Sequence, residues 1–446
     1  MSHNGFSQSS ERLHEIAARL VALARELGAD ACEAEASEGF GLTASVRKGE
    51  VDTLEHNRDK GVGITVYLGQ CRGHASSSDF SDAALRSTVE AALSIARFTA
   101  PDPAAGLPDE ALIARDWADP HLHYPWSLTV EDAIALAHRC EQAAWDAGPQ
   151  ISNSEGASVS TQQAHFVLAN SLGFVGGYPS SRHSVSCSVI AGKGDAMQRE
   201  HWYDSRREAT DLDSVESIGR RAGERAIRRL GARKINTCEV PVLFEAPVAV
   251  TLLGNFTHAV SGGALYRRSS FLLDSLGEPV FSPVVSIAER PFEPKVFGAS
   301  PFDGEGVATR ERDVVSAGVL QGYFLSSYSA RKLGMQTTGN AGGSHHLVMR
   351  GGDESFDALL RRMGRGLVVT ELLGQGVNYV TGDYSRGAAG YWVEDGEIRH
   401  AVEEVTIAGN LRDMFRGIVA VGDDALARGA KRCGSVLIDR MKVAGS

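Results

Sequence analysis

Residues 370–410 constrain the fold of this chain more than any other stretch. They read TELLGQGVNYVTGDYSRGAAGYWVEDGEIRHAVEEVTIAGN, a series of short strand-like runs separated by glycine-containing turns. Asp395-Gly396 suits a type I′ turn, whose twist matches that of a two-stranded hairpin. Glycine recurs at Gly374, Gly376, Gly382, Gly387 and Gly390, which indicates a backbone that some other group approaches closely. The segment therefore predicts a tightly turned sheet corner, which could serve packing alone.

The length of the chain predicts more than one domain. It has 446 residues, too many for one ordinary hydrophobic core. We expect an α+β protein: an N-terminal α+β domain at 1–110, a middle α+β domain at 111–236, and a mainly antiparallel β domain with a few helices at 237–446. The segment PDPAAGLPDE at 101–110 is the first expected linker.

Hydrophobic periodicity places the helices and strands of these regions. Helices are expected at 11–28, 81–99, 129–147 and 211–231, and in the C-terminal region at 246–260 and about 354–372. Short strands are expected at 31–36, 41–47, 50–56 and 61–69, within 152–192, and at 241–244.

Composition limits the class of protein. The net charge of −11 argues against binding nucleic acid, because phosphates require a basic surface. Six scattered cysteines indicate no disulfide framework and favour a reducing compartment. No run approaches the roughly 18–20 apolar residues that span a bilayer, and the N-terminus lacks the apolar core of a signal peptide. We expect a cytoplasmic protein with no membrane association.

Several longer motifs in one order resemble a known family. They are TASVRKGEVDTLEHNRDKGVGITVY at 43–67, NSEGASVS at 153–160, ALYRRSSFLLDSLG at 264–277, PFDGEGVATRERDVVSAG at 301–318, SSYSARKLGMQTTGNAGG at 326–343, CGSVL at 433–437, and the glycine-rich segment above. Together they resemble the TldD/PmbA family, which includes microcin-processing proteins.

The family has two branches, and one of them carries a zinc-binding HExxxH helix. The corresponding stretch here is PVAVTLLGNFTHAVSGGALYRR at 247–268. Placed without gaps, the two histidines become Gly254 and Ala259, the glutamate becomes Asn255, and His258 lies one position early. One imidazole without a carboxylate neither holds zinc tightly nor activates water. The resemblance therefore points to the TldE/PmbA branch, with no catalytic residue or metal ligand of its own.

No other metal or nucleophile motif replaces the lost one. The His14-Glu15 pair has Ala18 and Arg19 where a second ligand would stand, and the GxSxG, GxxxxGK[ST] and CxxC patterns are absent. Adjacent His345 and His346 would point to opposite faces of a strand.

Five residues are candidates for substrate or partner contact. His258 adjoins the degenerate positions. Cys433 lies where the resemblance implies a cysteine ligand in the zinc branch, although buried cysteines commonly serve packing. Tyr384, Arg386 and Trp392 stand among the glycines of TGDYSRGAAGYW, and aromatics with arginine dominate interface hot spots.

The resemblance implies a subunit of a cytosolic heterodimeric metalloprotease. A TldD-type partner would contribute the zinc and the glutamate, and the complex would degrade unfolded peptides such as microcin leaders and labile antitoxins. This chain would help to hold extended peptides, for which strand addition needs no sequence preference. Two alternatives stay open: a noncatalytic homodimeric peptide-binding or chaperone-like protein, and a free-standing hydrolase with an unrecognised site.

Overall fold

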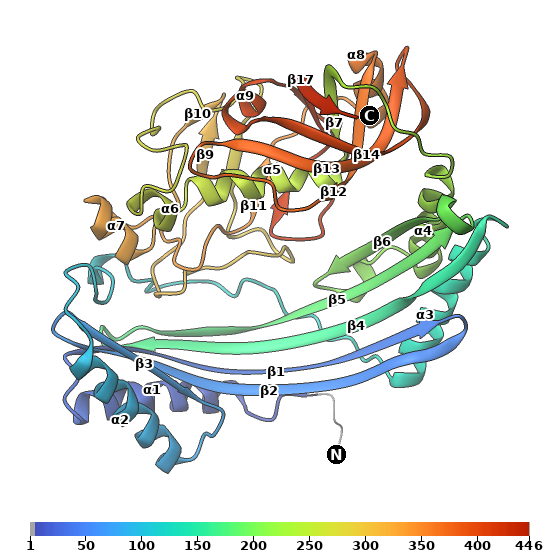
Figure 1. The fold of residues 1–446 in the computed structure, drawn as a ribbon. Helices are drawn as coiled ribbons and strands as arrows, with labels where there is room; N and C mark the ends of the chain where they lie inside the picture. The colour runs from blue at the N-terminus through green and yellow to red at the C-terminus, as the bar shows by residue number, and fades with distance from the viewer. Residues whose placement is uncertain (1–4, 446) are drawn as a thin grey trace.

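The first half of the chain forms one long, curved sheet (Figure 1). The computed structural model describes residues 5–445. Six antiparallel strands lie in the order β3 (Cys71–Ser77), β2 (Glu50–Leu68), β1 (Ala31–Arg47), β4 (Ile151–Asn170), β5 (Val175–Ala191) and β6 (Gln198–Arg206). The regions expected as N-terminal and middle domains thus both contribute strands to a single sheet.

Four helices cover one face of this sheet. They are α1 (Ser10–Glu26), α2 (Asp82–Phe98), α3 (Val130–Trp145) and α4 (Val215–Arg228), close to the four expected helices. α1 and α2 lie under one end, and α3 and α4 lie at the other (Figure 1). Alternate strand residues such as Ala34, Leu42 and Val46 are buried against them. Short 3₁₀ turns occur at Glu110–Leu112, Gly194–Ala196 and Ala209–Asp211.

The prediction of several short strands in the first 70 residues was wrong. β1 and β2 run without a break through the polar stretches at 37–41 and 57–61, and their backbones stay paired throughout. Gly41, in the first of these stretches, accommodates the side chain of Gln162, whose Oε1 would lie 2.1 Å from a Cβ at that position.

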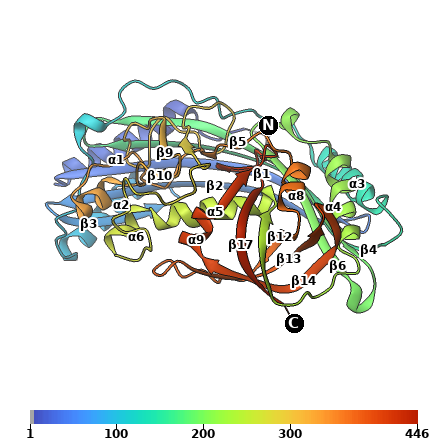
Figure 2. The ribbon, with the colours of Figure 1, turned by 90° about the horizontal axis from the view of Figure 1, so that it is seen from above.

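The C-terminal region is built mainly from two sheets (Figures 1 and 2). The larger has the order β14 (Glu397–Asn410), β13 (Asp383–Glu394), β12 (Gly366–Leu373), β7 (Cys238–Phe244), β17 (Val436–Ala444) and β15 (Ile418–Val421). β17 also pairs with β14, which closes β14, β13, β12, β7 and β17 into a ring and leaves β15 outside it, paired with β17. The smaller has the order β10 (Val319–Leu320), β9 (Arg312–Ser316), β8 (Ile287–Glu289), β11 (Leu347–Met349) and β16 (Lys431–Arg432).

Five helices accompany these sheets: α5 (Ala246–Ala259), α6 (Gly262–Tyr266), α7 (Ser327–Leu333), α8 (Phe356–Met363) and α9 (Leu411–Arg416). The prediction of a packed helix at 246–260 is confirmed, since Val248, Leu252 and Phe256 of α5 are buried in the core. Figure 1 shows α5 running below the larger sheet, on the side that faces the N-terminal half. Of the described helices, none is long and apolar enough to cross a bilayer.

Two further predictions have different outcomes. The hairpin at Asp395-Gly396 is confirmed: the two residues have φ angles of 54° and 74° and connect β13 to β14. The helix expected at 354–372 was wrong in its second half. Gly364, with φ of 67°, ends α8, and residues 366–373 form β12, a strand paired on both sides. The run Leu367–Val369 is fully buried, so its apolar pattern reflects a central strand rather than a helix.

A buried ionic network joins α4 to the C-terminal region. The guanidinium of Arg225 donates to both carboxylate oxygens of Glu245, at 2.8 and 3.0 Å, and lies 3.4 Å from Glu200 on β6. The ring of Trp202 contacts two further guanidinium groups. The distance from the guanidinium carbon to the ring centroid is 3.7 Å for Arg221 of α4 and 3.9 Å for Arg428 of the C-terminal region. These contacts fix the C-terminal region against the sheet.

Candidate functional site

Helix α5 carries the positions that the family resemblance places at the zinc-binding motif. Gly254 borders open space: apart from its own helix backbone, no described atom lies within 4 Å of the place where a Cβ would be. Ala259, in contrast, is fully buried. Asn255 is 7% exposed, and its Oδ1 accepts a hydrogen bond from the hydroxyl of Tyr379 at 3.0 Å. Gly254, Asn255 and Ala259 offer no imidazole, carboxylate or thiolate, so these three positions do not suit zinc.

His258 lies one helical turn after Gly254 and on the same side of α5. Its imidazole lies against the ring of Tyr379, with a centroid distance of 3.9 Å and an angle of 35° between the two ring planes. Partial burial, followed by the nearby charge of Arg267, lowers the pKa of His258. Tyr379 thus contacts both His258 and Asn255, and it joins the glycine-rich segment 370–410 to α5.

A cavity of about 650 Å³ opens beside this helix. Glycines, hydroxyl-bearing side chains and aromatic rings dominate its walls. The lining residues are Gly254, Thr257, His258, Ser261, Gly262, Gly263, Tyr266, Phe324, Ser326, Tyr328, Ser329, Asn340, Gly342, Gly343, Ser344 and Lys431. Such a lining can bind a polar ligand through hydrogen bonds, but it holds no carboxylate that could act as a general base.

Residues 5–445 contain no cluster of three or more His, Cys, Asp or Glu side chains arranged to bind a metal ion. Cys433 is fully buried, and this burial raises the pKa of its thiol to about 12. The protonated thiol is a poor metal ligand, because metals bind the thiolate. The metal content of the purified chain stays a prediction.

The three candidates in TGDYSRGAAGYW occupy different environments. Tyr384 is 1% exposed and Trp392 is 7% exposed, and both belong to the main C-terminal core. Burial raises the pKa of Tyr384 to about 12. Arg386 is half-buried, and its Nη2 donates to the carbonyl of Gly374 at 2.6 Å. The burial of the two rings favours a role in internal packing. An interface role stays a prediction, and Arg386 suits it best because it is the least buried of the three.

Alanine substitutions at Tyr384 and Arg386 can distinguish a role in core packing from a role in contacting a partner. We expect Tyr384→Ala to lower the free energy of unfolding by about 3–5 kcal/mol, because it removes a large ring from a closed core. Arg386→Ala should cost about 1 kcal/mol, since the half-buried guanidinium loses a hydrogen bond to a backbone carbonyl. Urea unfolding curves of the two variants check this. Equal stability of Tyr384→Ala and the parent protein would show that the ring is not a core residue.

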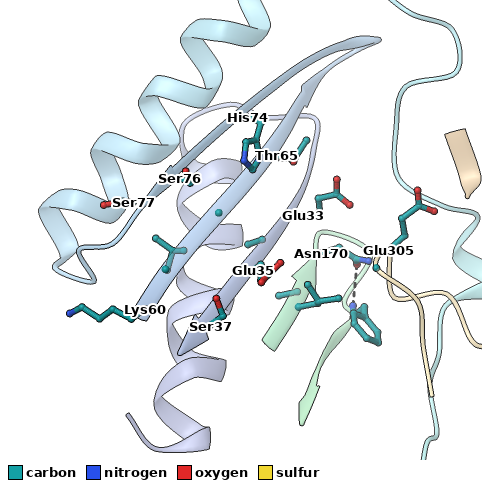
Figure 3. A pocket seen from close by; sticks show the side chains of 18 of the residues that line it. Glu33, Glu35, Ser37, Lys60, Thr65, His74, Ser76, Ser77, Asn170 and Glu305 are labelled. Atoms are coloured by element: carbon teal, nitrogen blue, oxygen red, sulfur yellow. Dashed lines mark hydrogen bonds between the residues drawn. The ribbon is translucent and has the colours of Figure 1, made fainter. Parts of the chain in front are cut away.

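A second, larger cavity of about 820 Å³ lies between the sheet and the C-terminal region (Figure 3). Glu33 and Glu35 project into it from β1, and Glu305 approaches from the opposite wall. Burial, followed by the charge of Glu305, raises the pKa of Glu33, and its Oε1 accepts a hydrogen bond from Tyr67 at 3.2 Å. The sheet face turned away from the helices therefore carries polar side chains at this point.

Sequence reasoning missed several residues of both cavities. Lys431 lies only two residues before Cys433, but nothing in the local pattern shows that β16 borders α5. Tyr379 stands within the segment that was singled out, and its contact with α5 depends on the tertiary fold. Glu33 and Glu305 are 272 positions apart and meet only because the C-terminal region folds back over β1.

Family models cover most of the chain in the same order. The first domain of the PmbA/TldA metallopeptidases matches residues 32–96, the central domain matches 123–230, and the C-terminal domain matches 237–445. The chain belongs to the PmbA/TldA metallopeptidase family. It is 46% identical to Metalloprotease PmbA of Escherichia coli O157:H7 over 98% of this chain and 97% of that one. The family resemblance seen in the motifs is therefore confirmed.

Relatives of both branches occur in one organism. In Haemophilus influenzae, a Metalloprotease PmbA homolog is 45% identical over 98% of this chain and 97% of its own length. A Metalloprotease TldD homolog from the same organism is 25% identical over 84% of this chain and 82% of its own length. The greater likeness to the PmbA proteins is consistent with the TldE/PmbA branch.

Solved structures share the fold. A crystal structure from Bacteroides thetaiotaomicron has a TM-score of 0.93 at 27% identity and covers 98% of this chain and 100% of its own. TldE from Thermococcus kodakarensis has a TM-score of 0.84 at 20% identity, covering 96% and 100%. The expected α+β architecture with a mainly antiparallel C-terminal region is thus confirmed; its parallel pairs are β7 with β12 and β11 with β16.

Proposed function

We propose that this chain is the TldE/PmbA-type, noncatalytic subunit of a two-protein cytosolic metalloprotease. One observation carries the proposal: at the place of the family's HExxxH motif, α5 presents Gly254, Asn255 and Ala259. A TldD-type partner supplies the zinc and the glutamate that activates water. The existence of both PmbA and TldD homologues in Haemophilus influenzae supports a division of labour between two chains.

This chain contributes surfaces that hold unfolded peptides, such as microcin leaders and labile antitoxins. β2 offers an edge for strand addition, because β3 pairs with it only from Val62 to Leu68. Among the described residues, no strand pairs with the outer edge of residues 50–61, whose main-chain groups are therefore open to an added strand. Main-chain hydrogen bonds give affinity without requiring a particular sequence.

The purified chain is expected to contain well under one zinc ion per molecule and to form a one-to-one complex with a TldD-type partner. Metal analysis by mass spectrometry and light scattering after gel filtration measure the two quantities. Near-stoichiometric zinc that resists mild chelation would favour the free-standing hydrolase instead. A homodimer that does not bind the TldD-type partner would favour the alternative of a noncatalytic peptide-binding or chaperone-like protein.

A further inference from the structure

The cavity beside α5 has an unbalanced charge. Among the described side chains that line it, Lys431 of β16 is the only Lys, Arg, Asp or Glu. Lys431 is half-buried, and its ammonium group has no hydrogen-bond or ion-pair partner among residues 5–445. Burial lowers the pKa of Lys431. The described part of the chain therefore supplies no counter-ion to the one cationic side chain that lines this cavity.

The carboxylates bonded to lining residues of the cavity are already engaged. Asp102 accepts hydrogen bonds from the hydroxyl of Tyr328 and from Lys332, both at 2.7 Å. Glu289 lies behind the wall and accepts from Arg312 at 2.7 Å and from Asn340 at 2.8 Å. Neither Asp102 nor Glu289 therefore forms an ion pair with Lys431.

The loop at 340–344 lines the same cavity as Lys431 and is held in place by hydrogen bonds. Its Asn340 is bound to Glu289, and the amide of Ala341 donates to the buried carboxylate of Asp303 at 2.9 Å. Gly342 and Gly343 follow with φ angles of 100° and 115°, a conformation that favours glycine. The amide N–H groups of Gly342 and Ser344 have no acceptor within the described part of the chain. Backbone amides without an internal acceptor, in a cavity that also contains a cationic side chain, can bind an anion.

We propose that this cavity binds the C-terminal carboxylate of a peptide, with Lys431 as the counter-ion and the amides of Gly342 and Ser344 as donors. The size of the cavity favours a peptide over a free inorganic anion, because about 650 Å³ leaves room for side chains beside the carboxylate. The rings of Tyr266, Phe324 and Tyr328 offer apolar surface for those side chains. The identification of the ligand as a peptide rests on the proposed function. The binding of the carboxylate needs only residues of this chain and can be measured without a partner.

Binding of a labelled peptide to the chain alone tests the proposal. The peptide has uncharged side chains and is made with either a free C-terminal carboxylate or a C-terminal amide. We expect the carboxylate form to bind about tenfold more tightly, as a charge-assisted hydrogen bond implies. Lys431→Met should remove this preference, and Lys431→Arg should keep most of it. Lys193→Met, at an exposed bend, serves as the matched control and should behave as the parent.

Three outcomes would overturn the proposal: equal affinity for the two peptides, no measurable binding of either, or a preference that survives in Lys431→Met. Inorganic phosphate is added as a competitor to distinguish the source of the anion. If phosphate binds in a Lys431-dependent manner while the two peptides bind alike, the cavity serves a free anion and the peptide assignment is wrong. These binding measurements use this chain without a partner. They would therefore stand even if the chain failed to assemble with a TldD-type protein.

Discussion

Replacing Gly390 by alanine is expected to lower the free energy of unfolding by more than about 4 kcal/mol, an exceptional cost for one methyl group. Gly390 lies in β13 beside β12, and a Cβ there would lie 1.8 Å from the carbonyl oxygen of Val368. The neighbouring backbone cannot withdraw without breaking the ladder between the two strands. Urea unfolding followed by tryptophan fluorescence measures the loss, and Trp392 lies on the same strand.

Gly254→Ala is the matched control for this substitution. It places the same methyl group within α5, where no atom lies within 4 Å of the added Cβ. Because alanine favours a helix over glycine, the variant should be as stable as the parent or more stable by up to about 1 kcal/mol. Similar unfolding midpoints for Gly390→Ala and the parent would mean that the close approach of β12 is not required by the fold.

Replacing Arg225 by methionine should lower the free energy of unfolding by about 3–5 kcal/mol, because it leaves the largely buried carboxylate of Glu245 without its ion-pair partner. Glu200 would keep its contact with Arg229 at 3.3 Å. The side chain of Arg225 is 12% exposed, and those of its partners Glu200 and Glu245 are 5% and 16% exposed. The network joins α4 to the C-terminal region, so the variant should also loosen the contact between the two halves of the chain. Hydrogen exchange of α4 amides would report that loosening.

Arg86→Met provides the surface counterpart. Arg86 also pairs with two carboxylates, Glu26 at 2.9 Å and Glu90 at 3.6 Å, but its side chain is 45% exposed. Solvent-exposed pairs contribute about 0–1 kcal/mol. A loss for Arg225→Met no greater than that for Arg86→Met would show that the interdomain network does not stabilise the fold.

Sequence reasoning succeeded where the signal was local. The helix at 246–260 and the Asp395-Gly396 turn follow from periodicity and turn chemistry, and both are present. The recurrent glycines did indicate a close backbone approach. At Gly376 and Gly390 the approaching groups belong to this chain itself: the carbonyl oxygens of Ser385 and Val368 would lie 1.7 and 1.8 Å from an added Cβ.

Tertiary packing decided what the sequence could not. The run after Gly364 is apolar enough for a helix or a buried strand, and only its pairing with β7 and β13 selects β12. Burial within the closed sheet could not be predicted for Tyr384 and Trp392, whose residue types are equally common at interfaces. The cavity beside α5 combines residues from 254 to 431, a separation over which no sequence pattern connects Lys431 to the degenerate motif.

Cleavage of an unfolded peptide tests the central claim most directly. The peptide is incubated with this chain, with a TldD-type partner, and with an equimolar mixture, each with and without a zinc chelator. Our account predicts cleavage by the mixture, its loss on chelation, and no cleavage by this chain alone. Chelator-sensitive cleavage by this chain alone, at a rate comparable to that of the mixture, would contradict the claim that its α5 helix has lost the catalytic groups.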